Sequence, residues 1–102
     1  MASLHVIETL QNLWRIPETV DEWESGYWAI KEPAAQKLMG GMLYLHQGQL
    51  KPSHFGGILL GSRIVSAGEY QGRIIFRFRF LPESKGIKTP REGWGNEKKF
   101  VW

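Results

Sequence analysis

The sequence contains no cysteine, so disulfides, thiolate metal sites and cysteine nucleophiles are all excluded. It also lacks long apolar runs, because glycine, arginine or glutamine interrupts each run well before the roughly 20 residues that a membrane helix needs. No basic segment followed by an apolar one opens the chain, which predicts a cytoplasmic protein. Internal repeats and low-complexity tracts are absent too. With 102 residues, 42% of them hydrophobic, the chain can build one core and is predicted to be a single domain, 1–102.

The charge is unevenly distributed along the chain, although the net value is only +3. Residues 1–32 carry six acidic and two basic side chains, whereas the remainder carries eleven basic and four acidic ones. A basic region attracts polyanions such as nucleic acid, and the acidic segment could cover that region or repel nucleic acid from one side. The alternative interpretation is ordinary solvated surface charge.

The first part of the chain has a helical pattern. Apolar residues recur at helical spacing behind a serine that can cap a helix, and they predict an amphipathic helix over residues 4–14. A capping-box spacing followed by a glycine predicts a second, shorter helix over residues 20–24. Together these helices would form an acidic helical segment over residues 1–26.

From Tyr27 onward the pattern changes to aromatic and β-branched runs separated by glycine. An aromatic-led strand is predicted first, followed by a helix of about two turns between Pro33 and Gly40, since proline favours the start of a helix and glycine its end. Three further strands are predicted in the barrel segment, which spans residues 27–81: 42–46, 56–65 and 73–80. The polar, glycine-rich segment 82–102 is predicted to be a long loop closed by a terminal strand.

The last two barrel strands are predicted to form an antiparallel hairpin, because the link 66–72 is short and contains two glycines. Side chains two positions apart share one face of a strand. Alternation therefore predicts one inward and one outward set in the strand 73–80. The inward set is Ile74, Phe76, Phe78 and Phe80, and the outward set is Arg73, Ile75, Arg77 and Arg79.

The segment Tyr27-Trp28-Ala29-Ile30-Lys31-Glu32-Pro33 resembles the opening of the EVE domain, a member of the PUA-like superfamily, with one residue of the family's turn missing. Residues 38–46 are similar to the family's helix, glycine turn and second strand, and 57–65 is similar to its next strand. The family's long insert is nearly absent, so a relative from the ASCH branch of the superfamily fits equally well. The resemblance implies an α+β fold, a small mixed β-pseudobarrel with short flanking helices. It also implies that an aromatic-lined pocket holds a nucleobase, often a modified one.

The resemblance carries over to five positions. Trp28 matches the opening aromatic residue, Lys31 and Glu32 match the turn beside it, and Tyr44 and His46 match the end of the second strand. A flipped base needs an aromatic face and a polar group at its edge, and these residue types supply both. The alternative for the aromatic residues is core packing.

Further candidates come from the residues themselves. Ser53 and His54 lie in a polar loop that would sit at the barrel rim, where functional residues and plain connections are both found. Trp94, between two glycines, could swing over a pocket or plug the open end of the barrel. Three basic residues are candidate phosphate contacts, with a solvated strand face as the alternative for the arginines. They are Lys51, Arg77 and Arg79.

Catalytic patterns are scarce. Ser53 and His54 are adjacent, so in an extended chain they point to opposite faces and form no nucleophile and base pair. The three histidines fit no common zinc spacing, and no phosphate loop, nucleophile elbow or dinucleotide fingerprint occurs. The sequence thus predicts a nucleic-acid-binding module for DNA or RNA with no cofactor and no metal. Two alternatives stay open: a protein-interaction module that uses the N-terminal helical segment, and RNA cleavage, because ASCH relatives include ribonucleases.

Overall fold

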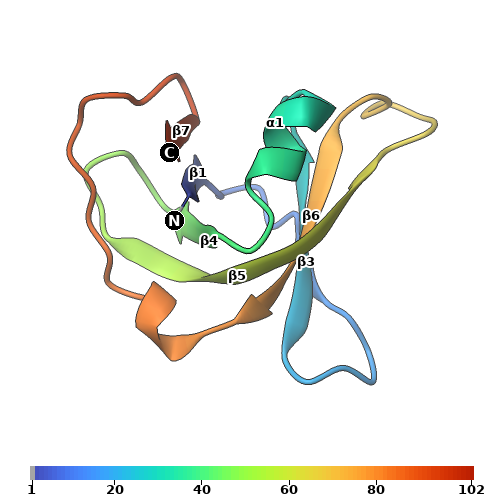
Figure 1. Ribbon diagram of the computed structural model, residues 1–102, viewed down its shortest axis with the longest axis horizontal. Helices are drawn as coiled ribbons and strands as arrows, with labels where there is room; N and C mark the ends of the chain where they lie inside the picture. Colours follow the sequence, from blue (N-terminus) through green and yellow to red (C-terminus); the bar gives the residue numbers. More distant parts are fainter. Residues whose placement is uncertain (1) are drawn as a thin grey trace.

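The computed structural model describes residues 2–102 as a small domain built on one mixed sheet of seven strands, with little helix (Figure 1). The strands are β1 (Ser3–Ile7), β2 (Leu13–Arg15), β3 (Glu22–Trp28), β4 (Met42–His46), β5 (Ser53–Ile64), β6 (Ile74–Phe80) and β7 (Lys98–Val101). Two helical elements are present, the α-helix α1 (Glu32–Lys37) and the 3₁₀ turn η1 (Pro82–Ser84). The strand order is β2-β3-β6-β5-β4-β1-β7, and β1 with β4 is the parallel pair.

The sheet is strongly curled, so that β1 and β4 lie opposite β3 and β6, and α1 covers one end of the space between them (Figure 1). This space is filled by the hydrophobic core, whose burial from water is the main stabilising term. No ladder among the described strands joins β2 to β7, so the curled sheet is left open between its two edge strands. The fold is therefore a mostly-strand domain with one layer of sheet wrapped around its own core.

The predicted hairpin is confirmed. Strands β5 and β6 pair antiparallel up to Ile64 and Ile74, on either side of the predicted link. In β6 the aromatic residues Phe76 and Phe78 are fully buried, while Arg77 and Arg79, which alternate with them, are exposed. Ile75 is a correction, because it was predicted to face outward and is only 2% exposed. Its side chain packs beside Gly26 of the adjacent strand β3, and the missing glycine side chain leaves room for it.

The predicted helix over residues 4–14 is wrong, and so is the shorter one over residues 20–24. The first segment forms β1, a link and β2, and the second lies in the turn before β3 and in β3 itself. Strand β1 pairs on both sides, with β4 and with β7. These tertiary partners outweigh a helical spacing of apolar residues, since local propensity is a weak prior.

The aromatic-led strand is a correction, because Tyr27 and Trp28 end strand β3 instead of opening a strand. The other predicted elements have counterparts: helix α1 spans Glu32–Lys37, strand β4 has the predicted bounds, β5 begins three residues earlier than predicted, and β7 is the terminal strand that closes the long loop. Neither helical segment in residues 2–102 is both long and apolar enough for a membrane crossing.

Candidate functional site

A cavity of about 150 Å³ lies where the end of β1 and the link after it approach the end of β3 and the β5–β6 hairpin. We call it the seam cavity. It is lined by apolar, aromatic and charged side chains together: Ile7, Glu8, Thr9, Leu10, Asn12, Gly26, Tyr27, Trp28, Tyr70, Arg73 and Glu97. Of the residues predicted to bind a ligand, Trp28 lies here.

Three aromatic rings give the seam cavity its planar surfaces. Trp28 is buried, and its indole N–H donates to the Ser25 hydroxyl at 3.1 Å, which fixes the ring. A register shift between Ser25 and Trp28 turns this tryptophan to the interior face of β3. Tyr27 and Tyr70 stack almost parallel, with ring centroids 4.2 Å apart and 4° between the planes. Arg73 donates to the Tyr27 carbonyl at 3.3 Å and so lies beside these rings.

Glu8 is the unusual polar group of this cavity. It follows the inward residues Leu4 and Val6 at a spacing of two, so it continues the interior face past the end of β1. The residue is 7% exposed, and its backbone N–H donates to the His46 carbonyl at 2.8 Å. Its carboxylate takes part in no ion pair of the described chain. This carboxylate is therefore free to accept hydrogen bonds from a group that enters the cavity.

A second hollow, of about 420 Å³, also has Glu8 in its wall. His54 lines it, and the His54 Nε2 atom is buried without a hydrogen-bond partner among the described residues. Two glutamines, Gln11 and Gln47, lie in the same wall. His54, predicted as a ligand contact, is therefore next to the seam cavity rather than in it.

Three other predicted residues lie together elsewhere, on the outer face of β1 and β4. The His5 ring stacks on Tyr44, with centroids 4.8 Å apart, and Trp94 presents its edge to His46 at 5.6 Å. Lys99 is buried beside them and donates to the Thr89 hydroxyl at 2.8 Å. We call this group the histidine layer: His5, Tyr44, His46, Trp94 and Lys99.

The two buried histidines share a hydrogen bond of 2.8 Å between His5 Nδ1 and His46 Nε2. His46 Nδ1 lies 2.8 Å from the Lys51 carbonyl, which can only accept, so this nitrogen carries the proton. His46 Nε2 is then the acceptor and His5 Nδ1 the donor, with both rings neutral. Burial, His46 and Lys99 lower the pKa of His5 to about 4, and burial lowers the pKa of His46. Neither ring lines the seam cavity, the hollow beside His54 or the two other hollows of the surface. We therefore interpret the pair as a structural polar network of the fold.

The other predicted ligand residues have separate surroundings. Lys31 and Glu32, at the start of α1, line a hollow of about 430 Å³ that shares Arg73 with the seam cavity. Ser53 is buried, and its hydroxyl accepts from the Ile87 N–H at 2.9 Å while donating to the chain at η1. Ser53 therefore attaches the long loop to β5.

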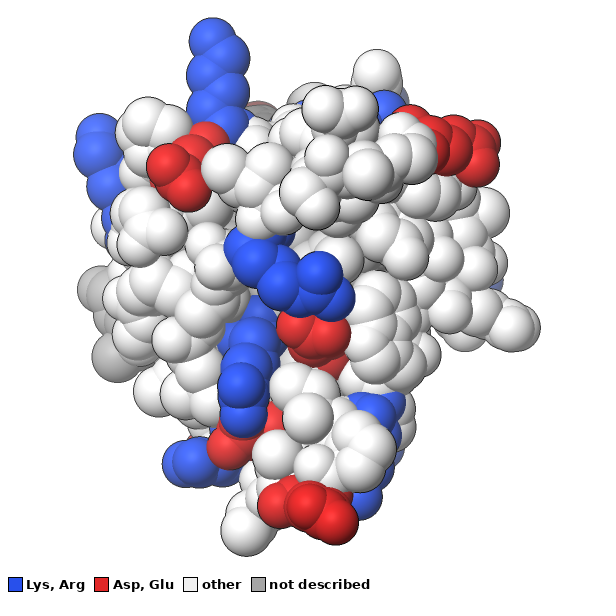
Figure 2. All heavy atoms as spheres, turned by 90° about the vertical axis from the view of Figure 1, so that its right-hand side faces the viewer, with Lys and Arg blue, Asp and Glu red and all other residues white. Residues whose placement is uncertain are grey.

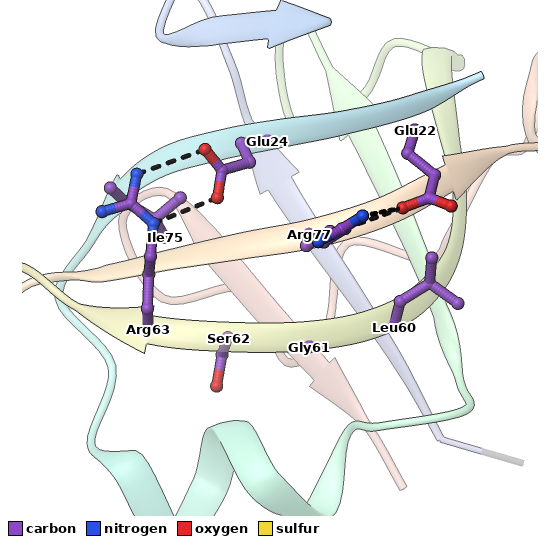
Figure 3. Close-up of a pocket in the computed structure, with 8 residues that line it drawn as sticks. All are labelled: Glu22, Glu24, Leu60, Gly61, Ser62, Arg63, Ile75 and Arg77. Atoms are coloured by element: carbon purple, nitrogen blue, oxygen red, sulfur yellow. Dashed lines mark hydrogen bonds and ion pairs between the residues drawn. The ribbon is translucent and has the colours of Figure 1, made fainter. Parts of the chain in front are cut away.

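The predicted phosphate contacts on β6 are paired with acidic residues. Glu22 on β3 accepts from Arg77 at 2.7 Å and from Arg79 at 3.5 Å. Glu24, two residues further on, accepts from both ends of the Arg63 guanidinium at 3.0 and 3.2 Å. Figure 3 shows two of these pairs beside a hollow of about 500 Å³. Arg77 with Glu22 joins the neighbouring strands β6 and β3, whereas Arg63 with Glu24 reaches from β5 to β3 across β6. On the face seen in Figure 2, basic side chains accordingly have acidic ones beside them.

These pairs shift the pKa values of both acids. Hydrogen bonds from Arg77 and Arg63 lower the pKa of Glu22 and of Glu24, respectively, and the bond to Glu24 raises the pKa of Arg63. Two carboxylates thus offset part of the charge of the three arginines on this face.

Several basic residues outside ion pairs lie on the Lys51 turn, in the loop after η1 and at the start of β7. None of the four ion pairs in the described chain includes a residue of the loop after η1 or Lys51. Gln49 donates to the Gly95 carbonyl at 3.0 Å, which joins the Lys51 turn to that loop. We call this set the basic loop: Lys51, Lys85, Lys88, Arg91 and Lys98.

Sequence reasoning missed Glu8, Tyr70, Arg73 and Glu97 as cavity residues. A period of two over Leu4, Val6 and Glu8 was the available signal, but the helical spacing of the same segment obscured it. In residues 2–102 no group of three histidine, aspartate or glutamate side chains is arranged to hold a metal ion. In comparisons with known proteins, no family model matches the chain, and neither a curated protein nor a solved structure matches it.

Proposed function

We propose that this protein is a PUA-like module that binds nucleic acid and holds one unpaired base, plain or modified, in the seam cavity. The observation that carries the proposal is the combination in one cavity of three aromatic rings and several polar groups. An unpaired base is recognised through stacking on aromatic faces and hydrogen bonds at its edge. Stacking contributes about 1 to 3 kcal/mol per base.

The charge distribution favours binding of the base and of the phosphates by different residues. Glu8 and Glu97 face the seam cavity, and carboxylates repel phosphate, so a base rather than a phosphate suits this cavity. Lys51, Lys88, Arg91 and Lys98 take part in no ion pair of residues 2–102 and can contact the nucleic-acid backbone, whereas Arg77 and Arg79 share the one carboxylate of Glu22. Phosphate contacts of this kind make binding strongly salt-dependent.

The two alternatives have less support. The protein-interaction reading depended on an N-terminal amphipathic helix, and that segment forms β1 and β2. For RNA cleavage, the hydrogen-bonded histidines His5 and His46 would be the natural pair, but they are buried and neutral under the long loop.

A binding titration tests the proposal. Fluorescently labelled single strands of DNA and RNA, and matched duplexes, are titrated with the protein at low and at moderate salt. We expect single strands to bind better than duplexes, with affinity falling as salt rises. Loss of Tyr70 in Tyr70→Ala should weaken binding about 5-fold to 150-fold, the equivalent of one stacked base.

Trp102→Ala is the matched control, because this aromatic residue is 62% exposed and lies outside the cavity. It should bind like the unaltered protein, and circular dichroism should show that both variants fold. Absence of binding to every strand at low salt would refute nucleic-acid binding. Binding that is equally strong in Tyr70→Ala would refute the role of the cavity.

A further inference from the structure

The Glu8 carboxylate lines the seam cavity and makes no hydrogen bond or ion pair within residues 2–102. The residue is 7% exposed, and among residues 2–102 the hydrogen bonds at this point involve its backbone rather than its side chain. The nearest cation in the wall, Arg73, directs a guanidinium nitrogen to the Tyr27 carbonyl at 3.3 Å. A carboxylate in a cavity wall without a partner in the protein is free to accept hydrogen bonds from a ligand that brings its own donors.

The position of Glu8 ties these donors to the aromatic rings. The residue lines the same cavity as Trp28, Tyr27 and Tyr70, whose rings can contact the faces of a planar group. A carboxylate has two oxygens and binds best to two parallel N–H groups on one edge. The complementary ligand is therefore a flat ring system with two adjacent N–H donors along one side.

Among the common bases this description fits guanine. Guanine presents its N1–H and its 2-amino group side by side, whereas adenine and cytosine present one amino group next to an acceptor nitrogen. Uracil and thymine present one N–H between two carbonyl oxygens, which a carboxylate repels. We infer that Glu8 reads the base in the seam cavity and selects guanine; this inference rests on the proposed function.

His54 is a further unsatisfied group beside the same carboxylate. Its buried Nε2 atom has no partner in the described chain, and it lines the neighbouring hollow that shares Glu8 with the seam cavity. A nucleotide whose base contacts Glu8 can thus extend toward His54 and the glutamine side chains of that hollow.

The test compares single strands of oligothymidylate or oligouridylate that carry one central guanine, hypoxanthine, adenine, cytosine or no replacement. Hypoxanthine differs from guanine by the missing 2-amino group, so this pair isolates one donor. We expect the guanine strand to bind about 5-fold to 150-fold more tightly than the unreplaced strand, with hypoxanthine between them. Using both sugar types distinguishes guanine in DNA from guanine in RNA.

Glu8→Gln keeps the shape of the side chain but replaces one acceptor oxygen with a donor. It should remove the guanine preference while leaving the salt-dependent affinity for the unreplaced strand intact. Glu83→Gln, an exposed glutamate of η1 outside the cavity, is the matched control and should keep the preference.

The outcomes are distinct. Guanine preference that Glu8→Gln abolishes and Glu83→Gln retains would support the inference. Binding without base preference, or a preference that survives Glu8→Gln, would overturn it and leave nucleic-acid binding in place. No binding of any strand would overturn the proposed function itself. The guanine and hypoxanthine comparison uses the unaltered protein, so it decides the matter even if Glu8→Gln fails to fold.

Discussion

Acidification is expected to destabilise the domain through the histidine layer. His5 is 4% exposed and lies between His46 and Lys99, so its folded-state pKa is about 4 against an ordinary 6.5. As the pH falls below 6.5, the unfolded chain binds a proton at His5 before the folded chain does. Stability is therefore complete above 6.5, is lost as the pH falls toward about 4, and then levels off. The loss integrates to about 3 kcal/mol, a large share of the stability of a small domain.

Urea unfolding followed by tryptophan fluorescence over a series of pH values measures this loss. The interval above pH 4.5 is the informative one, because the lowered pKa values of Glu22 and Glu24 confine their contribution to more acid conditions. His5→Gln should lower the slope by up to about 1.4 kcal/mol per pH unit, the value for one proton. Tyr44→Phe keeps the ring that stacks on His5 and should retain the slope. Stability that is constant between 6.5 and 4.5, or an unchanged slope in His5→Gln, would refute this reasoning.

Three further predictions address packing and charge. Gly57→Ala should lower the free energy of unfolding by about 1 to 3 kcal/mol or more, because its new Cβ would overlap a backbone carbonyl of β6. Gly61→Ala in the same strand meets open space and should change the free energy of unfolding by no more than about 0.5 kcal/mol. Coincident thermal melts of the two variants would contradict this. Ser53→Ala should lower the free energy of unfolding by about 1 to 3 kcal/mol and speed amide exchange in the loop after η1, since two hydrogen bonds are lost. Unchanged amide exchange would contradict this. Arg91→Ala should reduce the slope of log affinity against log salt concentration for nucleic-acid binding by about 1. Replacing the ion-paired residue in Arg77→Ala should leave this slope nearly unchanged. A larger effect of Arg77→Ala would reverse the assignment of the phosphate contacts.

The parts of the fold that could be predicted depend on local pairing. The β5–β6 hairpin joins neighbouring segments through one short link, and its alternation of aromatic and arginine residues marks the buried face of β6. Strand β1 is the opposite case, since its partners β4 and β7 lie about 40 and 95 residues further along the chain. A helical spacing within residues 4–14 carries no information about such distant partners, which is why it misled.

The candidate site, too, could be predicted only in part. Trp28 was predicted to stand near the start of a strand, whereas it is the last residue of β3 and lines the seam cavity there. Tyr44 and His46 share a strand face, as period-two alternation requires, but they pack under the long loop with Trp94 instead of lining the seam cavity. Period-two alternation predicts which residues share a face. It does not predict what covers that face, because this depends on the path of a loop distant in sequence.

Composition and local patterns are enough to indicate one small domain without thiol chemistry, with a short helix and an arginine-bearing hairpin. Which charges are free to act follows only from the folded arrangement of the strands. The fold brings Glu22 of β3 against Arg77 and Arg79 of β6, and it places Glu8, whose carboxylate has no ion-pair partner in residues 2–102, in the wall of the seam cavity. The physical reason is that ion pairing and desolvation depend on distances of a few ångströms between strands, and register and curvature of the whole sheet set those distances.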